Sequence, residues 1–325
     1  MKILIIGFGS MGKRRARLIK TVQQGAELCC VDSASSRRDE AVALGITPYS
    51  SLSEATAAQS FDAAFVCTSP LSHASIISDL LDANISLFTE LNLVSDGYSE
   101  NIAKAKAKNL VLFLSNTMIY RKEPQFIINE VHKYAKPMSY SYHIGQYLPD
   151  WHPWESYKSF FVGDKRTGGV REIFGIDLPW IIRAFGEIVD ITVQKATVSA
   201  LDLPYPDTYT VMLRHKSGSI GVFMADVVAP KAVRNFEAVG DGLHLFWEGN
   251  PKALYKYNKD IKDKEYINTY ASFEHDPRFS DNVVETAYAD EISNFFTVLK
   301  GEDKPLYSFD EDARALCVMD KIFNA

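Results

Sequence analysis

The sequence lacks the features expected of a membrane, nucleic-acid-binding or metal-binding protein. No apolar run approaches the roughly 20 residues that span a bilayer, and the short N-terminal run resembles a strand rather than a signal peptide. A net charge of −6 provides no positive surface for nucleic acid or anionic lipid. The four cysteines and seven histidines are scattered without metal-ligand spacing. We therefore expect a cytoplasmic protein with buried, reduced cysteines, no metal, and no nucleic-acid or membrane partner.

A glycine pattern stands at the start of the chain. A short apolar run leads directly into G-x-G-x-x-G, formed by Gly7, Gly9 and Gly12 with Ser10 and Met11 between the last two. In such a turn the first glycine makes the bend, the second lets the backbone approach a pyrophosphate, and the third lets the next helix pack closely. The helix N-terminus then points free N–H groups at phosphates. The pattern predicts a dinucleotide site. The basic run 13–17 that follows is expected to be a solvated helix face.

The second expected strand, 27–31, ends in Asp32, twenty positions after Gly12. A carboxylate at this place accepts hydrogen bonds from the ribose hydroxyls of the adenosine and would repel a 2′-phosphate, which favours NAD over NADP. Arg37 and Arg38 follow closely and offer the alternative. They either hold a 2′-phosphate or are solvated charges at the start of the next helix.

The first third of the chain alternates apolar runs with helical patterns, which is typical of a parallel Rossmann sheet covered on both faces. Strands are expected at 2–6, 27–31, 63–67, 85–89 and 111–115, and helices at 13–21, 38–44, 53–58, 72–83 and 99–108. We take residues 1–118 as a dinucleotide-binding domain. Ligands of such sheets bind at the carboxyl ends of the strands.

Beyond residue 118 the strands become longer and turn signals separate some of them, which indicates an open, mostly antiparallel sheet. They are expected at 140–145, 190–199, 209–215, 219–226, 234–239 and 243–248, with helices at 169–185 and 282–299. A last helix, 309–323, is expected to pack back onto the first domain. Residues 119–325 thus form an α+β domain for substrate binding and oligomerisation. An open sheet face favours a homo-oligomer, a dimer or tetramer.

Polar residues follow two of the expected strands at their carboxyl ends. Thr68 and Pro70 come after the third strand and are placed to line the nicotinamide ribose, with His73 in the next helical turn. His73 is either part of the cofactor site or a helix residue with no catalytic role. Glu90 ends the following strand and is also assigned to the cofactor site.

These features together resemble the glucose–fructose oxidoreductase and inositol dehydrogenase family (Gfo/Idh/MocA). The matching elements, in the family's order, are the glycine turn, Thr68-Ser69-Pro70-x-x-His73, the strand ending at Glu90, the helix opened by Gly168-Gly169, and the stretch that begins at Tyr288. The resemblance implies a nucleotide domain joined to a substrate domain with an open sheet. It also implies hydride transfer between nicotinamide and a sugar, polyol or sugar-nucleotide carbon, with cofactor and substrate meeting between the domains.

The chain departs from the family pattern at both proton-handling positions. Leu91 stands where the family has the lysine of Glu-Lys-Pro, and Asp177 stands where a G-x-H histidine is common. Leucine can neither donate a hydrogen bond nor transfer a proton. Asp177 falls on an apolar helical stripe, where a carboxylate is either paired or functional. It is therefore either the catalytic base or part of a salt bridge, with Arg171 or Arg183 as partner.

Two further segments are candidates for the site. Arg121 and Lys122 follow the last strand of the first domain, and either cation could replace the missing lysine and stabilise an alkoxide. The loop 145–157 holds two tryptophans and is interrupted by prolines. Within it we assign Asp150, Trp151 and His152 to substrate binding. Aromatic faces pack on pyranose rings while polar groups bond the hydroxyls. The alternative is an aromatic loop that closes the core or a subunit interface. A similar loop in family members of bacterial surface-sugar synthesis favours a sugar or sugar nucleotide.

The sequence thus predicts an NAD-dependent oxidoreductase of carbohydrate metabolism that acts on a CH–OH group, with Asp177 as the base. Loss of both family residues leaves open a dinucleotide-binding sensor or regulatory protein without turnover. A third reading is elimination or glycoside cleavage through transient oxidation.

Overall fold

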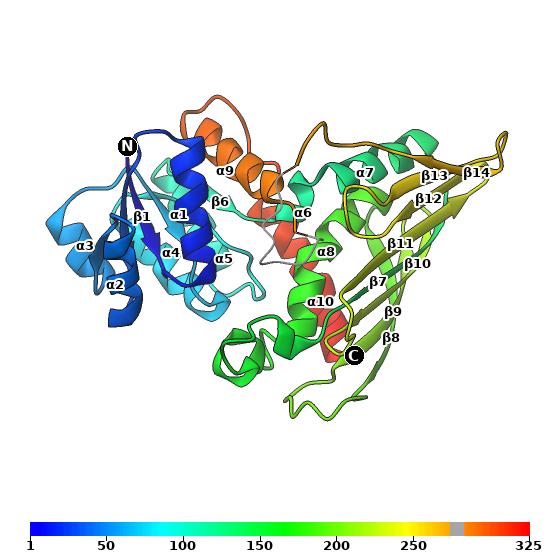
Figure 1. The fold of residues 1–325 in the computed structure, drawn as a ribbon, viewed down its shortest axis with the longest axis horizontal. Coiled ribbons are helices and arrows are strands. Elements are labelled where there is room, and N and C mark those ends of the chain that lie inside the picture. The colour runs from blue at the N-terminus through cyan, green and yellow to red at the C-terminus, as the bar shows by residue number, and fades with distance from the viewer. Residues whose placement is uncertain (274–282) are drawn as a thin grey trace. The chain divides into compact units, whose positions relative to one another are not determined.

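Two discontinuous stretches of chain build each unit of the fold (Figure 1). The first unit comprises Met1–Asn116 and Tyr288–Ala313, and the second comprises Thr117–Ala287 and Arg314–Ala325. The structure is a computed structural model that describes residues 1–273 and 283–325.

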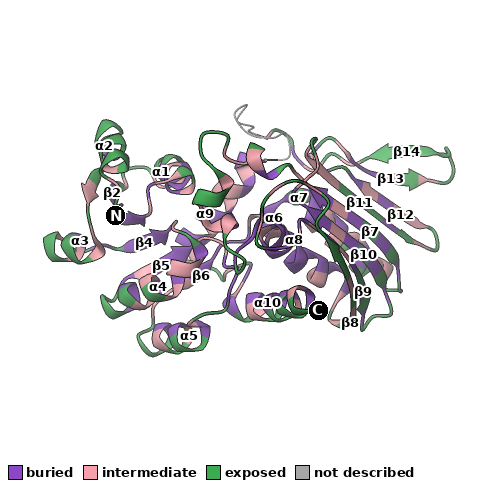
Figure 2. Ribbon diagram, turned by 90° about the horizontal axis from the view of Figure 1, so that it is seen from below, coloured by how far each residue is buried: buried purple, intermediate pink, exposed green. Residues whose placement is uncertain are grey.

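The first unit contains a parallel sheet in the strand order β3-β2-β1-β4-β5-β6, all of it within residues 1–114. Residues Ile3, Leu4 and Ile5 of the central strand are fully buried, because helices cover both of its faces. Figure 2 shows the buried colour on strand β4 of the same sheet. The strands are β1 (Lys2–Ile6), β2 (Glu27–Val31), β3 (Thr47–Tyr49), β4 (Ala63–Val66), β5 (Ser86–Thr89) and β6 (Leu112–Leu114).

Helices connect these strands, and a late segment of the chain completes the core. The connecting helices are α1 (Ser10–Val22), α2 (Ser35–Ala43), α3 (Leu52–Ala58), α4 (His73–Asp82) and α5 (Tyr98–Ala107). Phe65, Phe88 and Phe113, on neighbouring strands, stack with ring centroids 4.8 and 5.3 Å apart. Phe295 of α9 (Glu285–Leu299) meets all three rings edge-on. The last part of the chain is therefore needed to close the core of the first unit.

The second unit is built on a mostly antiparallel sheet in the order β14-β13-β12-β11-β7-β10-β9-β8, in which β7 and β10 are the parallel pair among the described strands. Alternate residues of β9 are buried, so one face of the sheet packs on the core and the other is open. The predicted fold class is confirmed. The strands are β7 (Ser139–Gly145), β8 (Ile188–Ala196), β9 (Thr208–His215), β10 (Ile220–Asp226), β11 (Val233–Gly240), β12 (Leu243–Trp247), β13 (Leu254–Asn258) and β14 (Asp263–Tyr266).

The long helix α8 (Gly169–Phe185) lies along the covered face of this sheet, against β9 and β10. Trp180 of α8 is fully buried and contacts Trp247 of β12 edge-on. Two shorter helices, α6 (Thr117–Tyr120) and α7 (Lys122–Tyr134), open the unit. The closing helix α10 (Phe309–Asn324) begins in the first unit and ends in the second.

Several elements differ from the sequence prediction. The strands β3, β13 and β14 and the helices α6 and α7 were not predicted. The predicted helix 282–299 begins at Asn282, which lies outside the described residues, and the described helix begins at Glu285. Cys29 and Cys30 are buried as expected, but Cys317 is exposed, because its position on α10 faces away from the packed side of that helix. In the part of the chain that the structure describes, no helix is long and apolar enough to cross a membrane, and no cluster of side chains has the make-up of a metal site.

Candidate functional site

The glycine turn between β1 and α1 contains two glycines that the fold itself requires, Gly7 and Gly12, and one that it does not, Gly9. A Cβ on Gly12 would lie 2.0 Å from the carbonyl oxygen of Gly7. Gly7 has a φ of +88° and would meet the carbonyl oxygen of Cys67 at 2.8 Å. The three atoms nearest to a Cβ on Gly9 would all belong to the Arg37 side chain, the first at an ordinary 3.6 Å. Nothing in the described protein demands glycine at position 9, so the residue is suited to the approach of a ligand.

The N-terminus of α1 is open toward the same turn. Among the described residues, no side chain caps this helix end and no acidic residue stands in its first turn. The backbone N–H groups of its first residues, Ser10 and Met11, therefore keep the unpaired donors and the positive dipole end that bind phosphate. An uncapped helix end beside Gly9 is a suitable cradle for the pyrophosphate of a dinucleotide.

Asp32 is held rigidly at the end of β2. Its Oδ2 accepts a hydrogen bond from the backbone N–H of Phe8 (2.8 Å), and its Oδ1 accepts one from Ala34 (2.9 Å). Because the bond from Phe8 joins Asp32 to the glycine turn, the carboxylate lies where the adenosine ribose of a dinucleotide is expected. The structure therefore fits a bound NAD at this end of the sheet.

The two arginines that follow Asp32 have different partners. Arg37 places its Nη1 atom 3.5 Å from Asp32 Oδ2, and its side chain lies over Gly9. Arg38 donates instead to the backbone carbonyls of Asp32 and Ser33. Of the two, Arg37 is therefore the residue beside the expected ribose, and Arg38 stabilises the loop.

The residues predicted after β4 also reach the glycine turn. The Thr68 methyl group would touch a Cβ on Gly7 at 2.9 Å, so this strand end and the turn lie together. Pro70 is buried and begins a short 3-10 helix. His73 is buried, with Nε2 2.9 Å from the Thr68 carbonyl oxygen and Nδ1 2.6 Å from Asn92 Oδ1. Burial lowers its pKa, so the ring is neutral and ties the two strand ends together.

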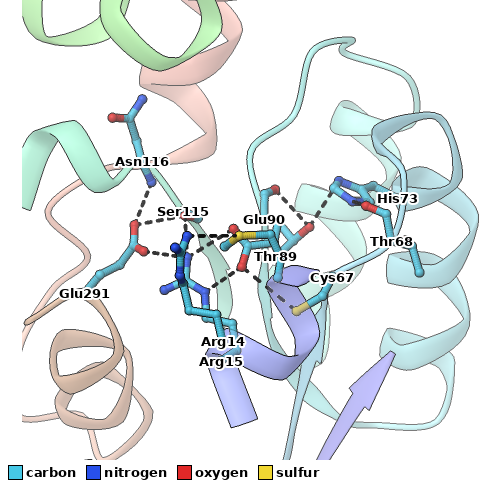
Figure 3. A network of polar contacts seen from close by, with 11 residues as sticks. Arg14, Arg15, Cys67, Thr68, His73, Thr89, Glu90, Ser115, Asn116 and Glu291 are labelled. Atoms are coloured by element: carbon cyan, nitrogen blue, oxygen red, sulfur yellow. Dashed lines mark hydrogen bonds and ion pairs between the residues drawn. The ribbon is translucent and has the colours of Figure 1, made fainter. Parts of the chain in front are cut away.

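Glu90 belongs to a buried ionic network that the sequence reasoning missed (Figure 3). Arg15 of α1 donates to Glu90, with Nε 2.5 Å from Oε1, and to Glu291 of α9, with Nη2 2.8 Å from Oε2. Glu291 also accepts from the hydroxyl of Ser115 and the backbone N–H of Asn116. Burial raises the pKa of Glu291, whereas Arg15 opposes that rise. Burial alone would lower the pKa of Arg15, but the two carboxylates outweigh it and raise it.

The expectation that 13–17 forms a solvated helix face is wrong for Arg14 and Arg15, which are both buried. The physical reason is that carboxylates from distant segments compensate the buried charge of Arg15. The sequence contained a signal for the burial of Arg15, because Met11, Leu18 and Ile19 lie on the same face of α1 at helical spacing from it.

Asp177 is in the second unit and is fully buried among donors. Its Oδ1 atom accepts from the Tyr142 hydroxyl (2.7 Å) and the Trp180 indole N–H (3.0 Å), and it is ion-paired with Arg234. Its Oδ2 atom has no hydrogen-bond partner among the described residues. The salt-bridge alternative placed the partner at Arg171 or Arg183, but the cation is Arg234, 57 positions away on β11. Arg171 pairs with Asp320 instead.

Glu172, one turn before Asp177 on α8, was not singled out from the sequence. It is half-buried, and its Oε2 atom is buried with no hydrogen-bond partner among the described residues. Burial raises the pKa of this carboxyl group to about 8. Tyr205 lies beside it, with its hydroxyl accepting from the Gly169 N–H (2.9 Å) and donating to the Val162 carbonyl (2.6 Å). A carboxyl group with this pKa exchanges protons near neutral pH.

The two cations proposed to replace the missing lysine have separate surroundings. Arg121 is buried, ion-paired with Glu123, bonded to the Gly249 carbonyl (2.9 Å), and stacked over the Trp247 ring. These contacts indicate that Arg121 stabilises the second unit. Lys122 is exposed, and its backbone N–H donates to the Tyr270 hydroxyl (2.9 Å).

The three residues predicted to bind substrate lie in a loop with short 3-10 turns between β7 and α8. Asp150 is exposed, and Trp151 is half-buried with its indole N–H donating to the Gln146 carbonyl (3.3 Å). His152 stacks between two aromatic rings and bonds Glu155 through Nδ1 (2.8 Å). Of the predicted residues, the cofactor set is thus gathered in the first unit. The others lie in the second.

The first unit, with its parallel sheet, glycine turn and uncapped helix, is a dinucleotide-binding domain. Residues 1–114 match the family model GFO_IDH_MocA, described as an oxidoreductase family with an NAD-binding Rossmann fold. This part of the chain therefore matches the Gfo/Idh/MocA oxidoreductases. The predicted family resemblance, the oxidoreductase class and the NAD-type cofactor are confirmed.

Solved structures resemble the chain over nearly its whole length. One is UDP-N-acetylglucosamine 3-dehydrogenase GnnA from Acidithiobacillus ferrooxidans, with a TM-score of 0.77 and 16% identity over 99% of this chain and 96% of that one. Another is WlbA dehydrogenase from Chromobacterium violaceum in complex with NADH and UDP-GlcNAcA, with a TM-score of 0.80 and 13% identity over 100% and 93%.

A third is an oxidoreductase from Agrobacterium radiobacter in complex with NAD+, L-tartaric acid and magnesium. Its TM-score is 0.80, at 13% identity over 100% of this chain and 95% of that one. At such identities these likenesses show the fold. Among curated proteins, no sequence match was found.

Proposed function

We propose that the protein is an NAD-dependent dehydrogenase that oxidises a secondary hydroxyl of a carbohydrate-like substrate, or reduces the corresponding ketone, and that Glu172 handles the proton. The observation that carries the proposal is the Glu172 carboxyl group, which has one buried oxygen without a partner. A structural glutamate would be paired, as Asp177 is with Arg234, because an uncompensated buried carboxyl group destabilises the fold. Solved structures of similar fold named as a sugar-nucleotide dehydrogenase support the substrate class.

When NAD is bound, its nicotinamide ring would accept the hydride. Glu172 in its carboxylate form takes the proton of the substrate hydroxyl while the carbon loses its hydride, so that the alcohol becomes a ketone and the carboxylate becomes a carboxylic acid. In the reverse direction the protonated Glu172 returns that proton to the oxygen. The pKa of about 8 makes both forms available near neutral pH.

Asp177 has a different role in this proposal. Its Oδ1 atom already accepts bonds from Tyr142, Trp180 and Arg234. These contacts form a charge-assisted network in a fully buried place, which is typical of a structural group. We therefore assign Asp177 to positioning Arg234 and α8, and we move the base proposed from the sequence to Glu172.

The test compares Glu172→Gln with Asp177→Asn in assays of NAD reduction with sugar nucleotides and polyols. The glutamine variant should fold, bind NADH as the wild type does, and lose roughly 100-fold or more in kcat. The asparagine variant should lose thermal stability and keep turnover in its folded fraction. Wild-type turnover by Glu172→Gln would refute the assignment of Glu172. NADH binding without turnover of any substrate by the wild type would favour the sensor function.

We also propose that the protein forms a homo-oligomer through the open face of the second unit's sheet. Large apolar side chains on this face are exposed in the single chain, among them Met212, Ile220, Val222 and Val239. These four residues lie on strands β9, β10 and β11, and exposed apolar side chains gathered on one sheet favour a protein partner. Light scattering on Met212→Lys and Val222→Lys, singly and together, should show a smaller species than the wild type.

A further inference from the structure

Three aromatic rings stack in the loop between β7 and α8. The His152 ring stacks on Trp154, with centroids 5.1 Å apart and planes 18° from parallel, and on Phe160, at 4.5 Å and 27°. No ring contact joins Trp154 to Phe160 in this described loop, so His152 lies between them. The result is a short column of rings in which Trp154 is one end.

The column is held in place by polar contacts at its centre. His152 Nδ1 lies 2.8 Å from Glu155 Oε1, and the backbone N–H of Glu155 donates to the His152 carbonyl (3.1 Å). At the far end, Phe160 meets Phe161 edge-on at 5.7 Å. Because both faces and one nitrogen of His152 are engaged, the His152 ring offers Trp154 a fixed base on which to stack.

Trp154 is exposed to an extent that its packing does not explain. Its exposed fraction is 67%, whereas Trp180 and Trp247 are fully buried. Its indole N–H makes no hydrogen bond to the described residues, unlike that of Trp151, which donates to Gln146. A large aromatic side chain left open on a fixed base is unfavourable in water and is typical of a binding surface.

The chemistry of the column selects among ligands. A pyranose ring bound on an aromatic face also needs polar groups to bond its hydroxyls, and two polar side chains of this loop, His152 and Glu155, bond each other. A planar heterocycle needs only the open face of Trp154, on which it can stack. We propose that Trp154 is the platform for the nucleobase of a nucleotide-linked substrate. The inference rests on the proposed function for the identity of that substrate, but not for the binding itself.

The test is calorimetric titration of the full-length protein saturated with NAD+, which keeps adenine-containing probes out of the cofactor site. The probes are UMP, AMP and ribose 5-phosphate, which has the sugar and the phosphate without the base. UMP and AMP should bind similarly, because stacking does not read base identity, and ribose 5-phosphate should bind at least roughly 10-fold more weakly. Trp154→Ala should weaken UMP binding by roughly 10-fold, and Trp154→Phe should retain most of it. Tyr257→Ala, another exposed aromatic on β13, is the control and should leave binding unchanged.

Equal binding of ribose 5-phosphate and UMP, or unchanged UMP affinity in Trp154→Ala, would overturn the inference. So would a change of oligomeric state in Trp154→Ala with no nucleotide binding in the wild type, since the platform would then be an interface between copies. Failure of the proposed function gives a different pattern, in which UMP binds through Trp154 and no sugar nucleotide is turned over. In an active enzyme, Trp154→Ala should raise KM for a nucleotide-linked substrate and leave kcat unchanged.

Discussion

Arg15 and Glu291 form a fully buried ion pair at 2.8 Å, although 276 positions of the sequence separate them. The same guanidinium group also holds Glu90 at the carboxyl end of β5. One cation thus joins the first helix of the nucleotide domain to Glu90, a residue predicted to line the cofactor site, and to a late helix.

Replacing Arg15 by Met should strongly destabilise the protein. The substitution leaves the fully buried carboxylate of Glu291 without its cation, and removal of one partner from a buried pair typically costs about 3–5 kcal/mol. Chemical denaturation should show this loss in the unfolding free energy. Arg17→Met, on the exposed side of α1, is the matched control and should stay within about 0.5 kcal/mol of the wild type.

Gly9→Ala should separate folding from cofactor binding. A methyl group at this position meets no close neighbour in the protein, so the unfolding midpoint should hardly change. The same methyl group would stand where the pyrophosphate approaches, and we expect NADH affinity to fall by at least roughly 10-fold. Gly12→Ala is the opposite case, because its Cβ would lie 2.0 Å from a carbonyl oxygen and should disrupt the turn itself. Wild-type NADH affinity in Gly9→Ala would argue against the site.

Asp32→Ser should change the preference between the two dinucleotides. The substitution removes the charge that repels a 2′-phosphate and leaves Arg37 beside the expected ribose. NADPH affinity should rise and NADH affinity should fall, each by roughly 10-fold, as measured by calorimetric titration. Adding Arg37→Ala should remove the gain in NADPH binding. If NADPH binds the double variant as well as the single one, Arg37 does not hold the phosphate.

Activity should depend on pH through Glu172. Its raised pKa of about 8 means that the carboxylate, the form that accepts a proton, predominates only above that pH. The rate of alcohol oxidation should therefore rise with pH, with its midpoint at about 8, and level off above it, and ketone reduction should fall over the same range. In Glu172→Gln the residual rate should be flat across this range. A wild-type profile that is retained in that variant would assign the ionisation to another group.

Stability should depend on pH through Asp312 of α10. Burial raises its pKa to about 6, and the hydroxyls of Tyr98 and Tyr307 donate to it. Because the folded pKa exceeds the unfolded one, the folded state favours the protonated form of Asp312. The contribution of this group to the free energy of unfolding is therefore fully present below about pH 4 and is lost as the pH rises through 6. Asp312→Asn should therefore be more stable than the wild type at pH 8, by on the order of 1–3 kcal/mol, with little difference at pH 4. Asp310→Asn, exposed in the same helical turn, should show no such dependence.

The features that local sequence reveals were predicted well. The glycine turn, the strand before it and Asp32 after it obey short-range steric rules, and five of the six parallel strands were found within a few residues of their bounds, with β3 missed. Helix α7 was missed, although Pro124 in its first turn and buried Ile127 and Val131 were visible signals.

Partners of buried charges were not predictable in the same way. Asp177 was recognised as paired or functional from its place on an apolar stripe, but Arg234 could be found only once β7 and β11 were known to be neighbours. Glu172 presents the opposite difficulty. What marks it is a missing partner for Oε2, and the lack of a contact leaves no trace in sequence spacing.

The discontinuity of the first unit bears on the order of events during synthesis. When Asn116 leaves the ribosome, every strand of the parallel sheet has been made, but Glu291, which bonds the Asn116 backbone, is still 175 residues away. At usual elongation rates that interval is roughly 10 to 35 s. During it the nascent sheet has neither the Phe295 ring that closes its core nor the anion that completes the pairing of Arg15. Most of the nucleotide domain is translated before the second unit, but it cannot reach its final structure until helix α9 has been made.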